Sequence, residues 1–124
     1  MANSAEAIVF GALKSLVANG DGTCRCYPDI GPALATRPYI TYQAVGGKSA
    51  NYLNNTTAAQ QNARIQVNVW ADDRATANSL MQSVINALCP PPIEATNIGA
   101  PASTWEFDTK LYGSRLDFSI WFTP

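Results

Sequence analysis

The chain has 124 residues, which is the size of one domain, with 47% apolar and only 14% charged residues. Its net charge is −1 and no run of one sign occurs, which excludes the electrostatic pattern of a nucleic-acid or anionic-membrane binder. Because ordinary globular chains carry roughly 25% charged residues, we expect part of this surface to be covered by partners. The prediction is a single domain, residues 1–124.

Cellular targeting signals are not evident. No apolar run approaches the 18 or so residues that span a bilayer. The first stretch, "MANSAEAIVFGALKSLVANG", lacks the basic region of a signal peptide. We therefore expect a soluble product of the cytoplasm.

The first predicted element is a helix over residues 4–19. Ser4 is a candidate N-cap, and "NGDG" at 19–22 ends the helix. "TCRCYPD", 23–29, then predicts a short strand that Pro28 stops. One face of the helix is apolar at helical spacing: Ile8, Val9, Ala12, Leu13, Leu16 and Val17.

A connector at 31–38 leads into a strand predicted at 39–45, "YITYQAV", which is rich in aromatic and β-branched residues. A polar segment follows from Gly46 to Asn62. A loop of about 17 residues is long for a compact domain, so it is either mobile or ordered by a partner, and we favour order by a partner.

The clearest elements lie between residues 63 and 88. "ARIQVNVW", 63–70, alternates as a strand does, with apolar Ile65, Val67 and Val69 opposite Arg64, Gln66, Asn68 and Trp70. Asp72 or Asp73 then caps a helix that "CPPP" at 89–92 ends. The apolar face of this helix is Ala77, Leu80, Met81, Val84, Ile85 and Leu88.

The last third of the chain predicts a loop at 93–103 and then a β-hairpin. Its strands are "TWEFDTKLY" and "RLDFSIWF", joined by a turn at Gly113 and Ser114. Together the elements predict an α+β fold, in which an antiparallel or mixed β-sheet has both α-helices packed on one face. The expected architecture is a single two-layer domain.

Catalytic motifs are not found in the sequence. The absence of histidine excludes Ser-His-Asp and Cys-His nucleophile arrangements. "GGKSANY" lacks the first glycine that a phosphate-binding loop requires. Asp72 with Asp73 is explained by helix capping, and Glu106 with Asp108 by a shared, solvated strand face. We expect no enzyme activity, no catalytic residue and no cofactor.

The three cysteines, Cys24, Cys26 and Cys89, are odd in number, and a Cys-x-Cys pair closes only a strained disulfide. A zinc site needs a fourth ligand, which no histidine supplies. We expect reduced thiols and no bound metal.

Aromatic side chains offer a candidate platform for stacking bases. Such platforms normally accompany a basic groove, so core and subunit-interface roles are favoured here. Trp70 and Trp121 fall on the polar faces of their strands, which a covering subunit and folding over the sheet rim explain equally well. The platform candidates are Trp70, Trp105, Trp121, Tyr39, Tyr42, Tyr52 and Tyr112.

The order of these elements resembles the phage tail-completion family, whose members include the tail terminator proteins of long-tailed phages. The resemblance covers nearly the whole chain. Its most specific segments are "PYITYQ", 38–43, and "RIQVNVWADDRATANSLMQSVINAL", 64–88, which form an architectural pattern and not a catalytic motif. The "CRC" pair and the triple proline depart from the family.

The resemblance implies a subunit of a ring, usually of six copies, that caps the tail tube and offers the docking surface for the DNA-filled head. Its partners would be further copies, the tail tube protein and a head-side neck protein, with no membrane. It would lie at the neck of the virion, after assembly in the host cytoplasm. Six touching globules leave a hole of roughly 35 Å, through which DNA passes without specific binding.

Residue roles follow from this expected ring. The loop from Gly46 to Asn62 would face the lumen or the tail tube. The residues expected there are Gly46, Gly47, Lys48, Asn51, Tyr52, Asn54 and Asn55. The candidates for intersubunit contacts are Arg64, Trp70, Asp72, Asp73, Arg74 and Trp121; a solvated contact near its own helix is the alternative for Arg74.

Three alternatives remain. A head-closure or head-tail joining ring on the head side would share the same features. A small metal-dependent enzyme would use Glu106, Asp108 and Asp117 and remain a monomer. A nucleic-acid-binding module would show salt-dependent affinity for DNA, which the low charge disfavours.

Overall fold

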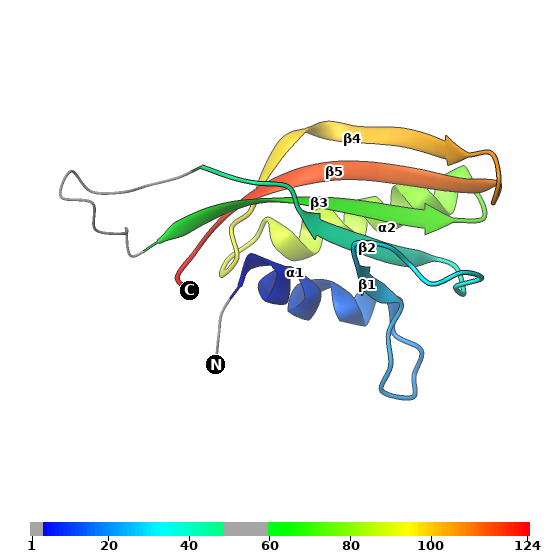
Figure 1. Cartoon of the computed structure of the whole chain (residues 1–124), viewed down its shortest axis with the longest axis horizontal. Helices are drawn as coiled ribbons and strands as arrows, with labels where there is room; N and C mark the ends of the chain where they lie inside the picture. Colours follow the sequence, from blue (N-terminus) through cyan, green and yellow to red (C-terminus); the bar gives the residue numbers. More distant parts are fainter. Residues whose placement is uncertain (1–3, 49–59) are drawn as a thin grey trace.

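The computed structural model describes residues 4–48 and 60–124. The described part holds one five-stranded sheet with both α-helices on one face (Figure 1). In chain order the elements are α1 (Ala5–Leu13), the 3₁₀ helix η1 (Lys14–Val17), β1 (Cys26–Pro28), β2 (Tyr39–Ala44), β3 (Gln61–Ala71), α2 (Arg74–Leu88), β4 (Thr96–Glu106) and β5 (Leu111–Phe122).

The sheet is mixed, with strand order β1-β2-β3-β5-β4. β1 runs parallel to β2, and all the other neighbours are antiparallel. The predicted α+β fold with two layers is therefore confirmed. None of the helices in the described residues is long and apolar enough to cross a membrane.

The first predicted helix is confirmed at its start and shortened at its end. The Ser4 hydroxyl accepts a hydrogen bond from the Ala7 amide at 3.1 Å, as an N-cap does. The α-helix ends at Leu13, and the chain then tightens into η1. Burial of Val9, Leu13 and Val17 at intervals of four shows that the predicted apolar face packs on the sheet.

The predicted second helix is confirmed as α2, and Asp73 is its N-cap. The Asp73 carboxylate accepts a hydrogen bond from the Thr76 amide at 2.7 Å. Asp72, the other candidate, instead pairs with Arg37. The buried face of α2 is Ala77, Leu80, Met81, Val84 and Leu88.

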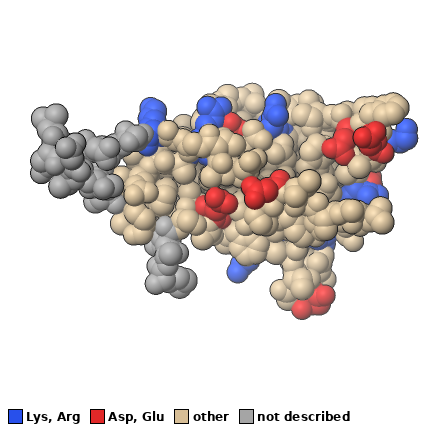
Figure 2. Space-filling view, viewed as in Figure 1, with Lys and Arg blue, Asp and Glu red and all other residues tan. Residues whose placement is uncertain are grey.

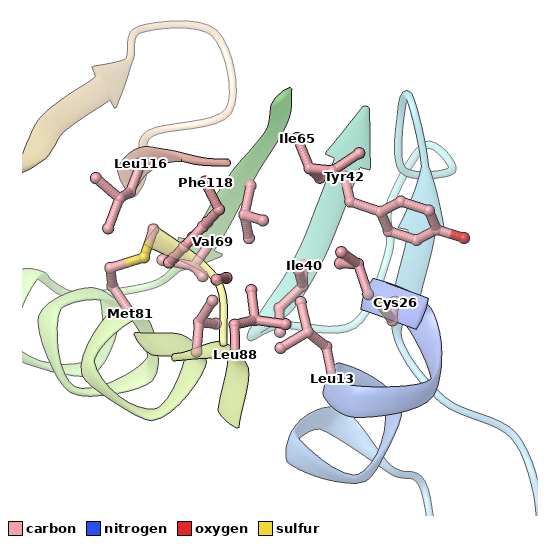
Figure 3. Packing of buried hydrophobic residues seen from close by; sticks show 14 of the residues in the cluster. Leu13, Cys26, Ile40, Tyr42, Ile65, Val69, Met81, Leu88, Leu116 and Phe118 are labelled. Atoms are coloured by element: carbon pink, nitrogen blue, oxygen red, sulfur yellow. The ribbon is translucent and has the colours of Figure 1, made fainter. Parts of the chain in front are cut away.

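The core lies between the helices and the sheet. Leu13, Met81 and Leu88 point from the helices toward the apolar side chains of the strands (Figure 3). Phe118 of β5 is fully buried among them. Burial of each such side chain stabilises the fold by about 1.5–3 kcal/mol relative to exposure, so this layer supplies most of the driving force.

β3 is the central strand, and it begins earlier than predicted. The loop expected to run to Asn62 is wrong at its end, because β3 starts at Gln61. The Asn62 amide donates hydrogen bonds to the Ser119 hydroxyl at 2.9 Å and to the Ile120 carbonyl at 3.2 Å. These side-chain bonds to β5 hold Asn62 in the sheet, although a polar residue of this kind is expected in a loop from composition alone.

The predicted loop at 93–103 and the predicted turn at Gly113 and Ser114 are both wrong. Residues 96–106 form β4, and the turn follows at 107–110. β4 gives no alternating pattern because nearly all of its residues are exposed. Gly113 lies inside β5 opposite Trp70, where an added Cβ would come within 2.8 Å of the Trp70 ring. Its glycine makes room for an indole and does not form a turn.

Candidate functional site

The face of the sheet that carries no helix holds a groove of about 700 Å³. Two segments form its walls. We call residues 29–37, which join β1 to β2, the connector arm, and residues 105–110, around the turn between β4 and β5, the turn arm. The floor comes from β2, β3 and the start of β5: Tyr39, Thr41, Gln43, Gln66, Asn68, Trp70 and Leu111.

The groove floor is polar but uncharged at its centre. Gln43 and Gln66 are cross-strand partners, and so are Thr41 and Asn68. Burial, and then the charge of Glu106, raise the pKa of Tyr39 above its ordinary value, so its hydroxyl stays protonated at neutral pH. Amides and hydroxyls of this kind donate and accept hydrogen bonds, so the floor is suited to contacts with polar groups.

Two predicted intersubunit residues take part in ion pairs within the chain. Arg64 donates to the Asp117 carboxylate at 2.7 Å across β3 and β5. Asp72 accepts from Arg37 at 2.6 Å, which ties the connector arm to the start of α2. The Arg37–Asp72 pair is exposed on both sides, so it contributes at most about 1 kcal/mol to stability, whereas Asp117 of the other pair is mostly buried. Their role between subunits stays a prediction.

Arg74 lies on the helix side of the sheet and not in the groove. Its guanidinium donates to the Gly113 carbonyl at 2.5 Å and to the Thr104 carbonyl at 2.8 Å. The same group lies 5.2 Å from the centre of the Tyr112 ring. Arg74 therefore joins α2 to β4 and β5, a link within the chain that the sequence did not indicate.

The two tryptophans of the polar strand faces lie at opposite ends of the groove face. Trp70 is half-buried across Gly113 and lines the groove. Trp121, near the end of β5, keeps 49% of its surface exposed. Packing within the sheet accounts for Trp70, whereas nothing in the described residues covers Trp121.

The aromatic residues do not form one stacking platform. Tyr42 and Tyr112 lie on the helix side, where Tyr42 packs against Phe10 and Tyr112 against Arg74. Tyr39 lies on the groove side, in edge contact with Tyr27. Tyr52 falls outside the described residues.

The acids of the metal-enzyme alternative are not brought together. Glu106 and Asp108 line the turn-arm wall of the groove, whereas Asp117 lies at mid-strand beside Arg64. The expectation that Glu106 and Asp108 share a strand face is wrong, because β4 ends at Glu106. Within residues 4–48 and 60–124, no group of three or more acids or cysteines is placed to hold a metal ion.

The three cysteines are free thiols in the structure. Burial, with the neighbouring Cys24, raises the pKa of the Cys26 thiol to about 12. Burial also raises the pKa of Cys89, whose Sγ donates to Asn97 Oδ1 at 3.0 Å. Cys26 and Cys89 are therefore protonated at neutral pH and are weak nucleophiles.

Only the base of the predicted lumen loop is described. Gly46 accepts from the Arg64 amide at 2.7 Å, and the Lys48 amide donates to Asn62 Oδ1 at 2.9 Å. Gly47 lies so close to the opposite strand that an added Cβ would meet the Asn62 carbonyl at 2.5 Å. Asn51, Tyr52, Asn54 and Asn55 lie outside the described residues.

The apolar side chains of the two arms were not predicted as part of a site. Ile30, Leu34 and Phe107 are among the most exposed large apolar residues in the described structure. An apolar residue in an irregular segment gives no periodic signal, so the sequence does not separate exposed from buried positions there.

The comparisons with known proteins agree with this architecture. A family model described as "Tail completion protein gp17" matches residues 9–123, which extend from α1 to the end of the last strand. A comparison with curated proteins finds no match.

Proposed function

Because the chain belongs to the phage tail completion protein gp17 family, we propose that it forms the ring that caps the tail tube and offers the docking surface for the head. The family match over residues 9–123 carries this proposal, because it covers the whole sheet and α2. The ring is a structural part of the virion at its neck, with the tail tube on one side and a head-side neck protein on the other.

The charge distribution supports a passage for DNA through this ring. The net charge is −1, and Figure 2 shows basic and acidic side chains scattered over a mostly uncharged face. A strongly basic lining would bind phosphates and slow the DNA, because each neutralised phosphate adds to the affinity. A nearly neutral ring lets the duplex pass.

The paired ends of β2 and β3 support a contact with the tube or the lumen. Figure 1 shows the end of β2 and the start of β3 on the side of the molecule away from the turn between β4 and β5. The backbone amides of Arg64 and Lys48 donate hydrogen bonds that hold the segment after β2 against the start of β3. In the proposed ring, the segment from Gly46 to Asn62 therefore faces the tail tube or the lumen.

Imaging of purified particles, averaged around the tail axis, tests the proposal. We expect a ring of about six copies between the tail tube and the head-side neck protein. A ring of this chain on the head side would instead support the head-closure or joining role. No density for the chain at the neck would overturn both assignments.

A nonsense mutation in the gene provides a second test. Without a cap, the tube keeps a free end to which subunits add, so we expect separate filled heads and tails of irregular length. Expression of the wild-type chain in the same cells should restore joined particles. Normal particles lacking the chain would contradict the proposal.

A further inference from the structure

Four exposed apolar side chains lie at one end of the sheet, on the two arms; those of the turn arm do not line the groove itself. On the connector arm, Ile30 is 82% and Leu34 98% exposed. On the turn arm, Phe107 is 73% and Trp105 48% exposed, and the two rings are in edge contact. Exposed apolar side chains that gather in this way mark surfaces that bind partners.

The two arms lie toward opposite edges of the sheet. The connector arm joins the edge strand β1 to β2, and the turn arm joins the other edge strand, β4, to β5. The row formed by Tyr39, Trp70, Gly113 and Thr104 crosses the sheet between them. Copies placed side by side in a ring would therefore bring one copy's turn arm to the next copy's connector arm.

Leu34 combines an exposed side chain with an unusual backbone conformation. Leu34 has φ of +60° within the turn that the Ala35 amide closes on the Pro32 carbonyl at 3.2 Å. This left-handed conformation favours glycine and is costly for a bulky residue. Asp29 and Lys110 share this conformation, so both arms contain residues held in a conformation that side chains rarely adopt.

The edge strand β4 supports the same surface. Glu106 is the only charged residue among its 11, and β5 is its only partner in the described structure. Exposed edge strands usually carry charges that prevent association with another chain. Pairing of β4 with another strand is hindered around Pro101, where the register is irregular between Ile98 and Ala102. The part of β4 beside the turn arm has no such irregularity.

The area and the charges fit a second copy as the partner. The four arm side chains offer on the order of 500 Å² of apolar surface, about a third of the area in a standard interface. Lys110 Nζ lies 5.4 Å from the Phe107 ring, and Asp29 precedes Ile30. Contact between Phe107 and Ile30 would bring Lys110, on an arm that also carries Glu106 and Asp108, toward Asp29.

We propose that the turn arm of one copy docks on the connector arm of the next, with Trp105 and Phe107 packed against Ile30 and Leu34. The contact joins two different surfaces, so it is heterologous, and it gives a ring where its repeated rotation closes. This inference rests on the proposed ring and names the surfaces by which its copies meet.

Cysteine cross-linking in particles tests this contact. The double variant Leu34→Cys/Phe107→Cys is produced together with wild-type copies, and purified particles are oxidised and analysed on a non-reducing gel. We expect a ladder of dimers and higher species. Each single variant alone should give no ladder, because two copies of position 34, or of position 107, do not meet. The single variants also control for Cys24, Cys26 and Cys89.

A mixture of the two single variants in the same particles sharpens the test. One heterologous contact then links each Leu34→Cys copy to one Phe107→Cys copy, so cross-linking should stop at dimers. Particles that contain the double variant without any ladder would overturn the arm contact and leave the ring intact. Particles that lack the wild-type chain would overturn the proposed function itself.

Discussion

Trp70 and Gly113 form a cross-strand pair in which the indole lies over a residue without a side chain. An added Cβ would lie 2.8 Å from the Trp70 ring and also against the Thr104 hydroxyl. We therefore expect Gly113→Ala to lower the free energy of unfolding by about 1–3 kcal/mol, as overpacking does. Urea denaturation of the purified chain measures this loss.

Gly11→Ala is the matched control for that substitution. Gly11 lies within α1, and an added Cβ meets nothing within 4 Å. We expect a gain of about 0.5–1 kcal/mol, because alanine is the better helix former. Equal effects of the two substitutions would contradict the packing explanation for Gly113.

Arg74 is expected to stabilise the fold through its two bonds to backbone carbonyls. Arg74→Ala leaves the Gly113 and Thr104 carbonyls without this donor, so we expect a loss of about 2 kcal/mol in the free energy of unfolding. Arg37→Ala removes an ion pair that is exposed on both sides and should cost under about 1 kcal/mol. Denaturation of both variants as isolated chains measures the two losses, and a harmless Arg74→Ala would show that these bonds add nothing to the stability of the single chain.

Because Asp73 caps α2 as a carboxylate, the free energy of unfolding depends on pH in the acid range. A hydrogen bond from the Thr76 amide is the main cause that lowers the pKa of Asp73 below its ordinary value. The ionised carboxylate therefore stabilises the fold above about pH 4, and this contribution is lost as the pH falls through the lowered pKa. We expect a melting temperature that falls in this acid range.

Two variants isolate this contribution. Asp73→Ala should melt a few degrees lower than the wild type at pH 7. Asp73→Asn keeps a capping oxygen and should lose less. The gap between the wild type and Asp73→Ala should narrow below pH 4. A gap that is the same at pH 3 and pH 7 would show that the charge of Asp73 contributes nothing. Asp21, whose pKa a Thr23 hydroxyl bond lowers, leaves some acid dependence in every variant.

At the scale of elements, the strands differ in whether one or both of their edges are hydrogen-bonded to a neighbouring strand. β3 and β5 pair on both sides, whereas β4 pairs only with β5 in the described structure. We expect outward amides of β4 to exchange hydrogen about a hundredfold faster than those of β3 in the isolated chain. Hydrogen exchange with mass spectrometry measures this. Equal protection of residues 102–106 and of β3 in a monomer would show that this edge is covered within the chain.

At the scale of the whole molecule, the low charge predicts weak interaction with DNA. With a net charge of −1 and no described basic groove, the isolated chain should show no measurable binding of duplex DNA at 200 mM salt. Fluorescence anisotropy at 50 and 200 mM salt measures this. Affinity that falls steeply between these concentrations would favour the nucleic-acid-binding module over a passage.

Local patterns in the sequence determined much of the fold. Ser4 caps the first helix, the spacing from Ala77 to Leu88 gives the buried face of α2, and Ile65, Val67 and Val69 give the core face of β3. These signals suffice because each buried face repeats with the period of its own element. The family resemblance likewise followed from the order of such elements.

Only the tertiary structure decided the roles that depend on distant residues. From the sequence Gly113 is predicted to form a turn, whereas in the fold it lies in a strand beneath Trp70. β4 shows no alternating pattern because nearly all of its residues are exposed. The arms of the groove meet the same limit, since residues 29–37 and 105–110 are far apart in the chain and join one surface only when the sheet forms. Periodicity reports the environment of an element along its own axis, whereas a site depends on which elements become neighbours.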